Sequence, residues 1–380
     1  MDARAPLTPI LRDLAADFAA TAAEHDRTGR FPFANFRRLY EEDLLALTVP
    51  RDLGGRGGGL DEAVETVGWI ARGEPSTALV LAMQYIAQAS IALANTWPKH
   101  LREQVGRDAA EAGALANALR VEPDLGSPAR GGLPATIARR HGDEWRISGR
   151  KIYSTGAPLL AWMLVWARTD EATPRVGTFL VPSTLPGIRI EETWDQLGMR
   201  ATRSDDVVFE DVAVPLDHAV DIRLAGDWLT QNRLQYAWHS VLVPAIYDGI
   251  ARAARDWLVG FLKTRTPSNL GKPLATLPRA QEALGEIEVL LAVNQRLIAS
   301  YVRDVEAGVL PGEDEGGLIK LTVTRNAIEV VEQALKLSGN HGIARANPLE
   351  RHLRDVLCGR IHTPQEDSVR LAAGRRALDL

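Results

Sequence analysis

Apolar residues recur at helical spacing over the first part of the chain. Between Leu7 and Glu24 they follow one another at intervals of three and four, and residues 36–47 and 60–70 repeat the pattern after loops rich in Pro or Gly. The most apolar run, residues 78–94, is broken by Gln84, Gln88 and Ser90, so it does not resemble a membrane-spanning helix. We therefore expect an N-terminal helical domain over residues 1–113.

The pattern changes near Ala114. From there to Phe209 the apolar segments are short, rich in β-branched residues and separated by Gly, Pro or Asp. The spacers are too short to contain crossover helices, which favours antiparallel pairing. We expect a barrel-like antiparallel β domain over residues 114–222, with strands in 114–121, 136–141, 144–155, 161–168, 176–181, 188–191 and 206–209.

Long helical periods return after Pro215. Residues 234–262 and the stretch from Leu284 to Leu335 carry apolar residues at near-heptad spacing, which is typical of a helical bundle. We expect a four-helix bundle over residues 223–380 and an α+β fold of helical, β and helical domains in this order. Because the helices offer enough apolar surface to pack against a second subunit, we also expect a homo-oligomer, either a dimer or a dimer of dimers.

The stretch from Glu144 to Arg168 is the most informative part of the middle domain. Trp and Leu residues fall on one face of its second half at period two, and Gly156 and Pro158 punctuate a turn. This places Tyr153, Ser154 and Thr155 at a strand end. Small hydroxyl donors in such a place suit one edge of a flat heterocycle, although the same residues are also ordinary strand formers.

Composition narrows the choice of function. Of 380 residues, 46% are apolar and 24% are charged, as in an ordinary globular protein, and the net charge of -5 argues against nucleic acid or an anionic membrane as the main partner. Cys358 is the single cysteine, so an internal disulfide is impossible and we expect a reducing, cytoplasmic location. No metal or serine-hydrolase motif occurs, and the glycine loop before Leu60 lacks the Lys-Ser/Thr ending of a phosphate-binding loop.

Four segments, taken in order, resemble the acyl-CoA dehydrogenase superfamily over nearly the whole chain. They are the loop Arg120–Ser127, the strand end Lys151–Thr155, the Leu-Gly-x-Arg segment Trp194–Ser204 with its following strand, and the Arg-Asp helix Leu349–Asp355. The resemblance implies a flavin, FAD more than FMN, held between the β domain and the bundle, with phosphate contacts from a neighbouring subunit. It assigns flavin contacts to Val121, Ser127, Tyr153, Ser154, Thr155, Arg265, Lys336 and Gly339.

The catalytic positions depart from the dehydrogenase pattern. Counting from Arg354-Asp355, the glutamate that takes the α proton of a thioester falls on Thr363, and an alternative carboxylate position falls on His239. His362 is similar to a histidine in the flavin monooxygenase branch of the fold, of which dibenzothiophene monooxygenase is the type. There reduced flavin meets O2, and the site stabilises a C4a-hydroperoxide and moves one proton.

The candidate catalytic residues are therefore His362, His239 and Thr363, with Tyr236 and Gln84 in the substrate pocket. Gln84 stands where that branch would carry a second histidine. Three hypotheses follow: a monooxygenase for a small organic substrate, fed reduced flavin by a separate reductase; an acyl-CoA dehydrogenase with a displaced base; and a non-catalytic flavin-binding protein.

Overall fold

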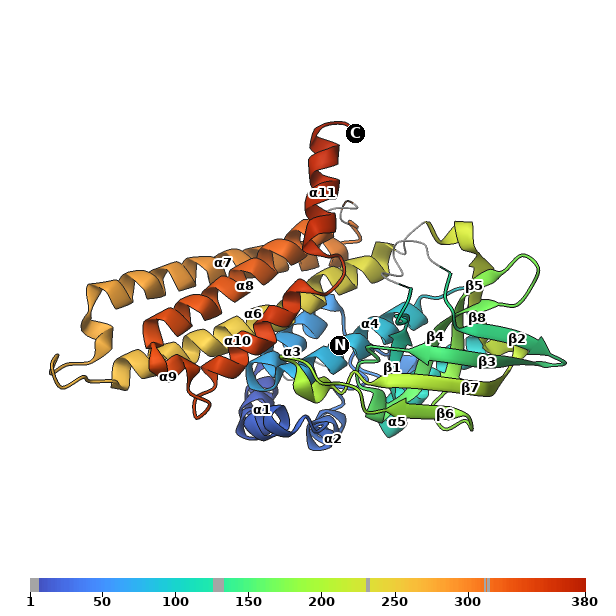
Figure 1. Ribbon diagram of the computed structural model, residues 1–380, viewed down its shortest axis with the longest axis horizontal. Coiled ribbons are helices and arrows are strands. Elements are labelled where there is room, and N and C mark those ends of the chain that lie inside the picture. Colours follow the sequence, from blue (N-terminus) through green and yellow to red (C-terminus); the bar gives the residue numbers. More distant parts are fainter. Residues whose placement is uncertain (1–6, 126–132, 230–232, 311, 313–314) are drawn as a thin grey trace.

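The computed structural model describes residues 7–125, 133–229, 233–310, 312 and 315–380. The sheet lies at one end of the molecule, the bundle helices extend along the long axis to the other end, and the N-terminal helices α1 (Leu7–Thr28) and α3 (Leu60–Gly73) lie between the two (Figure 1). This arrangement confirms the expected order of helical, β and helical parts. None of the helices in the described ranges combines the length and apolarity needed to span a bilayer.

Five helices form the N-terminal part: α1 (Leu7–Thr28), α2 (Phe33–Glu41), α3 (Leu60–Gly73), α4 (Pro75–Ala92) and α5 (Lys99–Ala112). The apolar positions of α1 that follow helical spacing are all buried. Helix α4 is buried on almost every side, as its largely apolar sequence requires. Its N-terminus is capped by Glu74, whose carboxylate accepts the backbone N–H groups of Ser76 and Thr77.

The sheet contains β1 (Leu115–Leu119), β2 (Ile137–His141), β3 (Glu144–Lys151), β4 (Leu160–Thr169), β5 (Arg175–Pro182), β6 (Ile188–Glu191), β7 (Asp206–Pro215) and β8 (Ala219–Leu224). Its order is β6-β7-β3-β2-β4-β5-β8, with β1 paired to β4. The expectation of purely antiparallel pairing was wrong, because β1 and β2 both run parallel to β4. The β2–β3 hairpin lies between β1 and β4 in the sequence and replaces the crossover helix that parallel strands usually need.

The two faces of β4 pack against different parts of the protein. Trp162 and Leu164 lie in an apolar cluster with Leu101 and Val105 of α5. The alternate residues of β4 point into the main core, which the sheet shares with α4 and the bundle. The face expected from the period-two pattern is therefore the one that docks on the N-terminal helices.

The C-terminal part is built on three long helices, α6 (Arg233–Thr264), α7 (Pro278–Glu306) and α8 (Glu315–Ser338), with the shorter α9 (Asn340–Ile343), α10 (Leu349–Leu357) and α11 (Glu366–Ala377). Asn294 of α7 is completely buried. Its Nδ2 donates to Asp248 Oδ1 of α6 at 3.0 Å and to the carbonyl oxygen of Val323 of α8 at 3.2 Å. One polar residue therefore fixes the register of three helices. Helix α11 stands away from the bundle axis (Figure 1).

Candidate functional site

Two histidines and a lysine come together where α6 and α8 begin. His239 lies in the second turn of α6, Lys320 in the second turn of α8, and His362 in the segment between α10 and α11. The ring centroid of His362 lies 5.7 Å from that of Tyr247. The charge of Lys320 acts on both histidines, and His239 acts on His362, so the three form one electrostatic unit.

Both imidazoles are neutral at pH 7. Burial, with a smaller effect of Lys320, lowers the pKa of His239 to about 4. Burial, followed by His239 and Lys320, lowers the pKa of His362 to about 3. A neutral imidazole carries one N–H donor and one acceptor, so each ring can donate or accept a proton. Burial disfavours the positively charged form of both rings.

Lys320 holds the segment that carries His362. Its side chain is 2% exposed, and its Nζ donates to the carbonyl oxygens of His362 at 2.8 Å and Pro364 at 3.1 Å. Burial lowers the pKa of Lys320 to about 8, against the opposing effect of Glu366. The ammonium is therefore mostly charged at pH 7, and two charge-assisted hydrogen bonds anchor this segment to α8.

Two glycines at the start of α8 allow the helices to approach each other closely. A Cβ on Gly316 would lie 2.8 Å from both Ser240 Oγ of α6 and Tyr301 Oη of α7. A Cβ on Gly317 would lie 3.3 Å from Tyr236 Oη. Tyr236, expected in a substrate pocket, thus lies against the first turn of α8, at the same end of the bundle as the histidines.

In the described part of the chain, no carboxylate is hydrogen-bonded to or ion-paired with the histidine cluster. No Asp or Glu side chain forms a hydrogen bond or ion pair with His239, His362 or Lys320, and Thr363 is exposed beside them. Asp355 of α10 is a buried carboxyl group whose pKa is raised to about 7 by burial. Its Oδ1 accepts the backbone N–H of Met199 at 2.7 Å, which ties α10 to the segment after β6.

The segment Tyr153–Thr155 follows β3 as an irregular turn. Tyr153 has a φ of 57°, a left-handed conformation that is costly for an aromatic residue, and its side chain is 56% exposed. Its ring meets that of Trp194 edge-on at 6.2 Å. The Ser154 Oγ is buried and has no hydrogen-bond partner among the described residues. An exposed aromatic ring beside an unsatisfied hydroxyl group fits a planar, polar-edged ligand.

The Thr155 hydroxyl ends a short hydrogen-bond relay. Thr202 Oγ1 and Ser204 Oγ are 2.9 Å apart, and Ser204 Oγ donates to Thr155 Oγ1 at 3.0 Å. The Thr202 hydroxyl donates to the Met199 carbonyl oxygen at 2.9 Å. Because the Ser204 hydroxyl donates to Thr155, the Thr155 hydroxyl hydrogen is left to donate elsewhere. Asn117 of β1 fixes the turn by donating to the Thr155 carbonyl oxygen at 3.0 Å. These features fit the flavin-edge donor that the resemblance assigns to Thr155.

The other β-domain position expected at the flavin is braced by a buried ion pair. The carbonyl oxygen of Val121 accepts the N–H of Ile152 at 3.0 Å. Next to it, Glu122 meets Lys151 Nζ at 2.6 Å, and both side chains are buried. Ser127 lies outside the described residues.

Three expected flavin contacts lie at the opposite end of the bundle. Arg265 directly follows the last residue of α6, whereas His239 lies near its beginning. The 26 positions between them correspond to about 39 Å along an α-helix at 1.5 Å per residue. Lys336 and Gly339 lie beside α9, which Figure 1 places at the end far from the sheet. One chain therefore does not bring these residues to the histidine cluster.

The side-chain amide of Gln84 is hydrogen-bonded to three backbone groups. Its Nε2 donates to the carbonyl oxygens of Leu45 and Ala114, and its Oε1 accepts the N–H of Ala116 at 2.7 Å. The side chain is 1% exposed. Every polar atom of the amide is used, and we assign Gln84 a structural role that joins α4 to β1.

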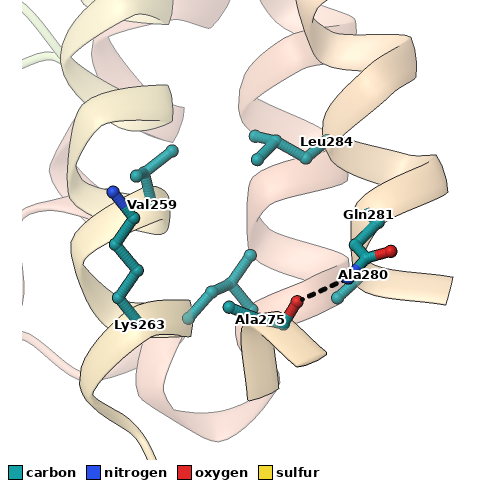
Figure 2. A pocket seen from close by; sticks show the side chains of 7 residues that line it. Val259, Lys263, Ala275, Ala280, Gln281 and Leu284 are labelled. Atoms are coloured by element: carbon teal, nitrogen blue, oxygen red, sulfur yellow. Dashed lines mark hydrogen bonds between the residues drawn. The ribbon is translucent and has the colours of Figure 1, made fainter. Parts of the chain in front are cut away.

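A small hollow lies at the far end of the bundle, between the end of α6 and the start of α7 (Figure 2). Its walls are mostly apolar, and Gln281 Nε2 donates to the Ala275 carbonyl oxygen at 3.0 Å across its rim. Lys263 is its one charged lining residue. The hollow has no acid–base pair and is remote from the histidines. In the described ranges, no three His, Cys, Asp or Glu side chains are placed to hold a metal ion.

Sequence reasoning missed Lys320 and the relay through Ser204. Lys320 occupies the buried stripe of α8 that contains Gly316, Val323 and Thr324, so a charged residue at a core position was the available signal. The relay had no such signal. Ser204 is 49 residues from Thr155, and only the pairing of β3 with β7 brings the two segments together.

Comparisons with known proteins fit this geometry. The chain matches the N-terminal, middle and C-terminal domains of acyl-CoA dehydrogenases over residues 9–116, 119–212 and 242–366. It is 33% identical to the putative acyl-CoA dehydrogenase YdbM of Bacillus subtilis, across 94% of this chain and 92% of that protein. The chain belongs to the acyl-CoA dehydrogenase family. The family expected from the four sequence segments is thereby confirmed.

Other relatives of this acyl-CoA dehydrogenase family member carry different names. It is 30% identical to L-evernosamine nitrososynthase of a Micromonospora species, over 96% of this chain and 89% of that one. The solved structure of KijD3 in complex with FMN and dTDP-3-amino-2,3,6-trideoxy-4-keto-3-methyl-D-glucose has a TM-score of 0.85 and 28% identity. The match covers 99% of this chain and 94% of KijD3.

Proposed function

We propose that the protein is a flavin-dependent monooxygenase that uses reduced flavin and O2 on a small organic substrate, with a separate reductase supplying the reduced flavin. The observation that carries the proposal is the histidine cluster: two neutral imidazoles and a buried lysine, with no carboxylate bonded to them in the described chain. By the sequence resemblance, Thr363 and His239 correspond to the two positions where the family's dehydrogenases carry the proton-abstracting glutamate. An uncharged hydroxyl group cannot take a proton from carbon at pH 7.

Two of the relatives are not named as dehydrogenases. One is a nitrososynthase, and the other was solved with FMN and an amino sugar. Both match this chain over nearly its whole length. Neither name refers to a CoA thioester, whereas YdbM is named a putative acyl-CoA dehydrogenase, so the choice between the two functions rests on the histidine cluster and not on the names of the relatives.

The residues of this chain divide the work between holding the ring and moving a proton. Bound reduced flavin supplies two electrons, so that one atom of O2 enters the substrate and the other leaves as water. The free hydroxyl hydrogen of Thr155 would donate to the ring edge, and Tyr153 and Ser154 would line it. His362 and His239, held neutral by burial, would give and take the single proton that the reaction requires.

A complete flavin site would need two subunits. The residues assigned to the flavin ring lie in the β domain, whereas Arg265 lies about 39 Å from His239 by the length of α6, and Lys336 and Gly339 lie at the same far end of the bundle. We therefore propose a homo-oligomer in which the far end of one bundle meets the β domain of another chain. We favour FAD over FMN because a single phosphate would leave this second set of residues without a ligand.

The test is a reaction coupled to a flavin reductase and supplied with 18O2. We expect O2 consumption to depend on substrate and one labelled oxygen atom to appear in the product. Replacing His362 with Gln removes the titrating ring but keeps a polar side chain. We expect it to lower kcat by about 10²-fold or more, the usual contribution of a positioned proton-transfer group. Full activity of this variant, or label found only in water, would contradict the proposal.

The second candidate is an acyl-CoA dehydrogenase with a displaced base. It is favoured by Asp355, whose pKa of about 7 is that of a general base at neutral pH. The two functions differ in the absence of oxygen: a saturated acyl-CoA should bleach the oxidised flavin of a dehydrogenase and leave that of the monooxygenase unchanged. If bleaching occurs and Asp355→Asn abolishes it, the second function replaces the first.

A further inference from the structure

Arg120 is an exposed cation to which the described residues supply no counter-ion. It follows β1, and its guanidinium carbon lies 4.4 Å from the centre of the Trp166 ring of β4. Among the described residues it forms no hydrogen bond and no ion pair. Neighbouring atoms lower the pKa of Arg120 by desolvation, and no carboxylate opposes them.

A second arginine in the same aromatic cluster, Arg223, has a carboxylate that neutralises its charge. Trp228 meets Trp166 edge-on with ring centroids 4.5 Å apart, and Arg223 lies 4.4 Å over the Trp228 ring. Arg223 is held by both carboxylate oxygens of Asp221, each at 2.8 Å. Two arginines therefore lie on two neighbouring indoles, and only one of them is neutralised by an acid.

Arg120 lies on an open part of the β1–β4 surface. The register of this parallel pair puts Ala116 beside Trp162, where the N-terminal helices cover both. Two and four residues farther along β1, Ala118 and Arg120 are exposed on the same face. The covering helices thus end before Arg120, and its donor groups are accessible.

The charge of Arg120 is felt by Lys151, which is paired with Glu122 in a unit that is neutral as a whole. The same strand is joined to the candidate flavin segment through the Asn117 hydrogen bond to Thr155. Because side chains alternate along a strand, Asn117 and Arg120 point to opposite faces, so an anion bound at Arg120 would lie at the end of the strand whose other face supports Thr155.

We propose that Arg120, braced by Trp166, binds an anionic group of the organic substrate, either a carboxylate or a phosphate. One face of the guanidinium is occupied by the indole, and its edge of N–H donors is free for a two-point hydrogen bond to two oxygen atoms. The bound anion would supply the counter-charge that Arg120 lacks. The identity of the anion as part of a substrate rests on the proposed function, whereas the anion site rests on this geometry alone.

Calorimetric titration of the flavin-loaded, oxidised protein with glutarate and, separately, inorganic pyrophosphate tests the site without turnover. We expect one of the two probes to bind, and Arg120→Gln to weaken it by at least about tenfold, as the loss of a two-point charged contact predicts. Arg120→Lys keeps the charge without the fork and should recover only part of the affinity. The matched control is Arg223→Gln, which changes an arginine in the same cluster and should leave the affinity unchanged.

Three results would overturn the assignment. The first is that neither probe binds, and the second is that Arg120→Gln and Arg223→Gln weaken binding equally. The third comes from comparing FMN with riboflavin: if Arg120→Gln weakens only FMN, the anion is the cofactor phosphate and not part of the substrate. Thermal unfolding separates binding from structure, because Arg120→Gln loses only the contact with the Trp166 ring and should lower the melting temperature by no more than Arg223→Gln, which also loses the ion pair with Asp221. Because the titration measures binding and not reaction with oxygen, its outcome can be interpreted even if the monooxygenase proposal fails.

Discussion

The buried ion pair between Glu122 and Lys151 allows a direct test of how the segment that follows β1 is held. Lys151 is completely buried and Glu122 is 3% exposed. Besides Lys151, Glu122 accepts the backbone N–H groups of Ala135 at 2.6 Å and Thr136 at 3.0 Å. Burial would raise the pKa of Glu122, but hydrogen bonds from Lys151 and Thr136 bring it below its ordinary value. Burial lowers the pKa of Lys151 to about 8, so both groups are charged at pH 7.

Replacing Glu122 with Gln leaves this arrangement one acceptor short. Three donors face the two carboxylate oxygens, and an amide would present an NH2 group to at least one of them while Lys151 loses its counter-charge. Removing one partner of a buried pair typically costs about 3–5 kcal/mol of unfolding free energy. The double variant Glu122→Gln with Lys151→Met removes the isolated charge, and we expect it to regain most of that loss.

The measurement is a double-mutant cycle by urea unfolding at pH 7, followed by tryptophan fluorescence. We expect Glu122→Gln to lose about 3 kcal/mol or more and the double variant to lie within about 2 kcal/mol of the parent protein. A single variant that loses less than about 1 kcal/mol would refute the reasoning, because the pair would then contribute no more than an exposed one. A double variant no more stable than Glu122→Gln would refute it as well.

Three further predictions concern the bundle. Burial, helped by Arg351, lowers the pKa of His352 to about 3. The neutral ring's contribution to stability is therefore complete above pH 6.5 and declines as the pH falls toward 3. In His352→Leu, the loss of unfolding free energy between pH 8 and pH 5, measured by urea titration at each pH, should be smaller by about 2 kcal/mol. Lys320→Met should raise the pKa of His239 and His362 and move the acidic limb of the activity profile to higher pH, with Lys320→Arg preserving the charge as its control; identical profiles would contradict this. Gly316→Ala should cost about 1–3 kcal/mol because its Cβ would meet two hydroxyl groups at 2.8 Å, whereas Gly285→Ala has open space and should be neutral or stabilising by about 1 kcal/mol.

Most of the fold could be predicted because the local pattern of apolar and polar residues identifies most helices and strands. The spacing of apolar residues located α1, and the alternation around Trp162 identified the face of β4 that packs on the helices. Strand direction could not be predicted in the same way. Local pattern does not show that the β2–β3 hairpin separates two parallel neighbours, because parallel and antiparallel strands carry similar side chains when one sheet is buried on both faces.

The candidate site was accessible to sequence reasoning only in part. His362 and His239 could be named from a resemblance, but their neutral state depends on burial and on Lys320, which lies on another helix. Gln84 could be placed at a matching position, yet nothing local shows that its amide is used by three backbone groups. Interactions between distant segments decide such roles, and spacing along one segment does not contain them.

The length of α6 has a consequence for mixtures of variants. Because this single rod separates His239 from Arg265 by about 39 Å, damage at one end leaves the other end of the same chain intact. Two inactive proteins, one altered at each end, would hold complementary undamaged halves. In the homo-oligomer proposed above, co-expression of the two variants should give hybrid particles in which some sites combine both undamaged ends, so activity would return without either defect being repaired.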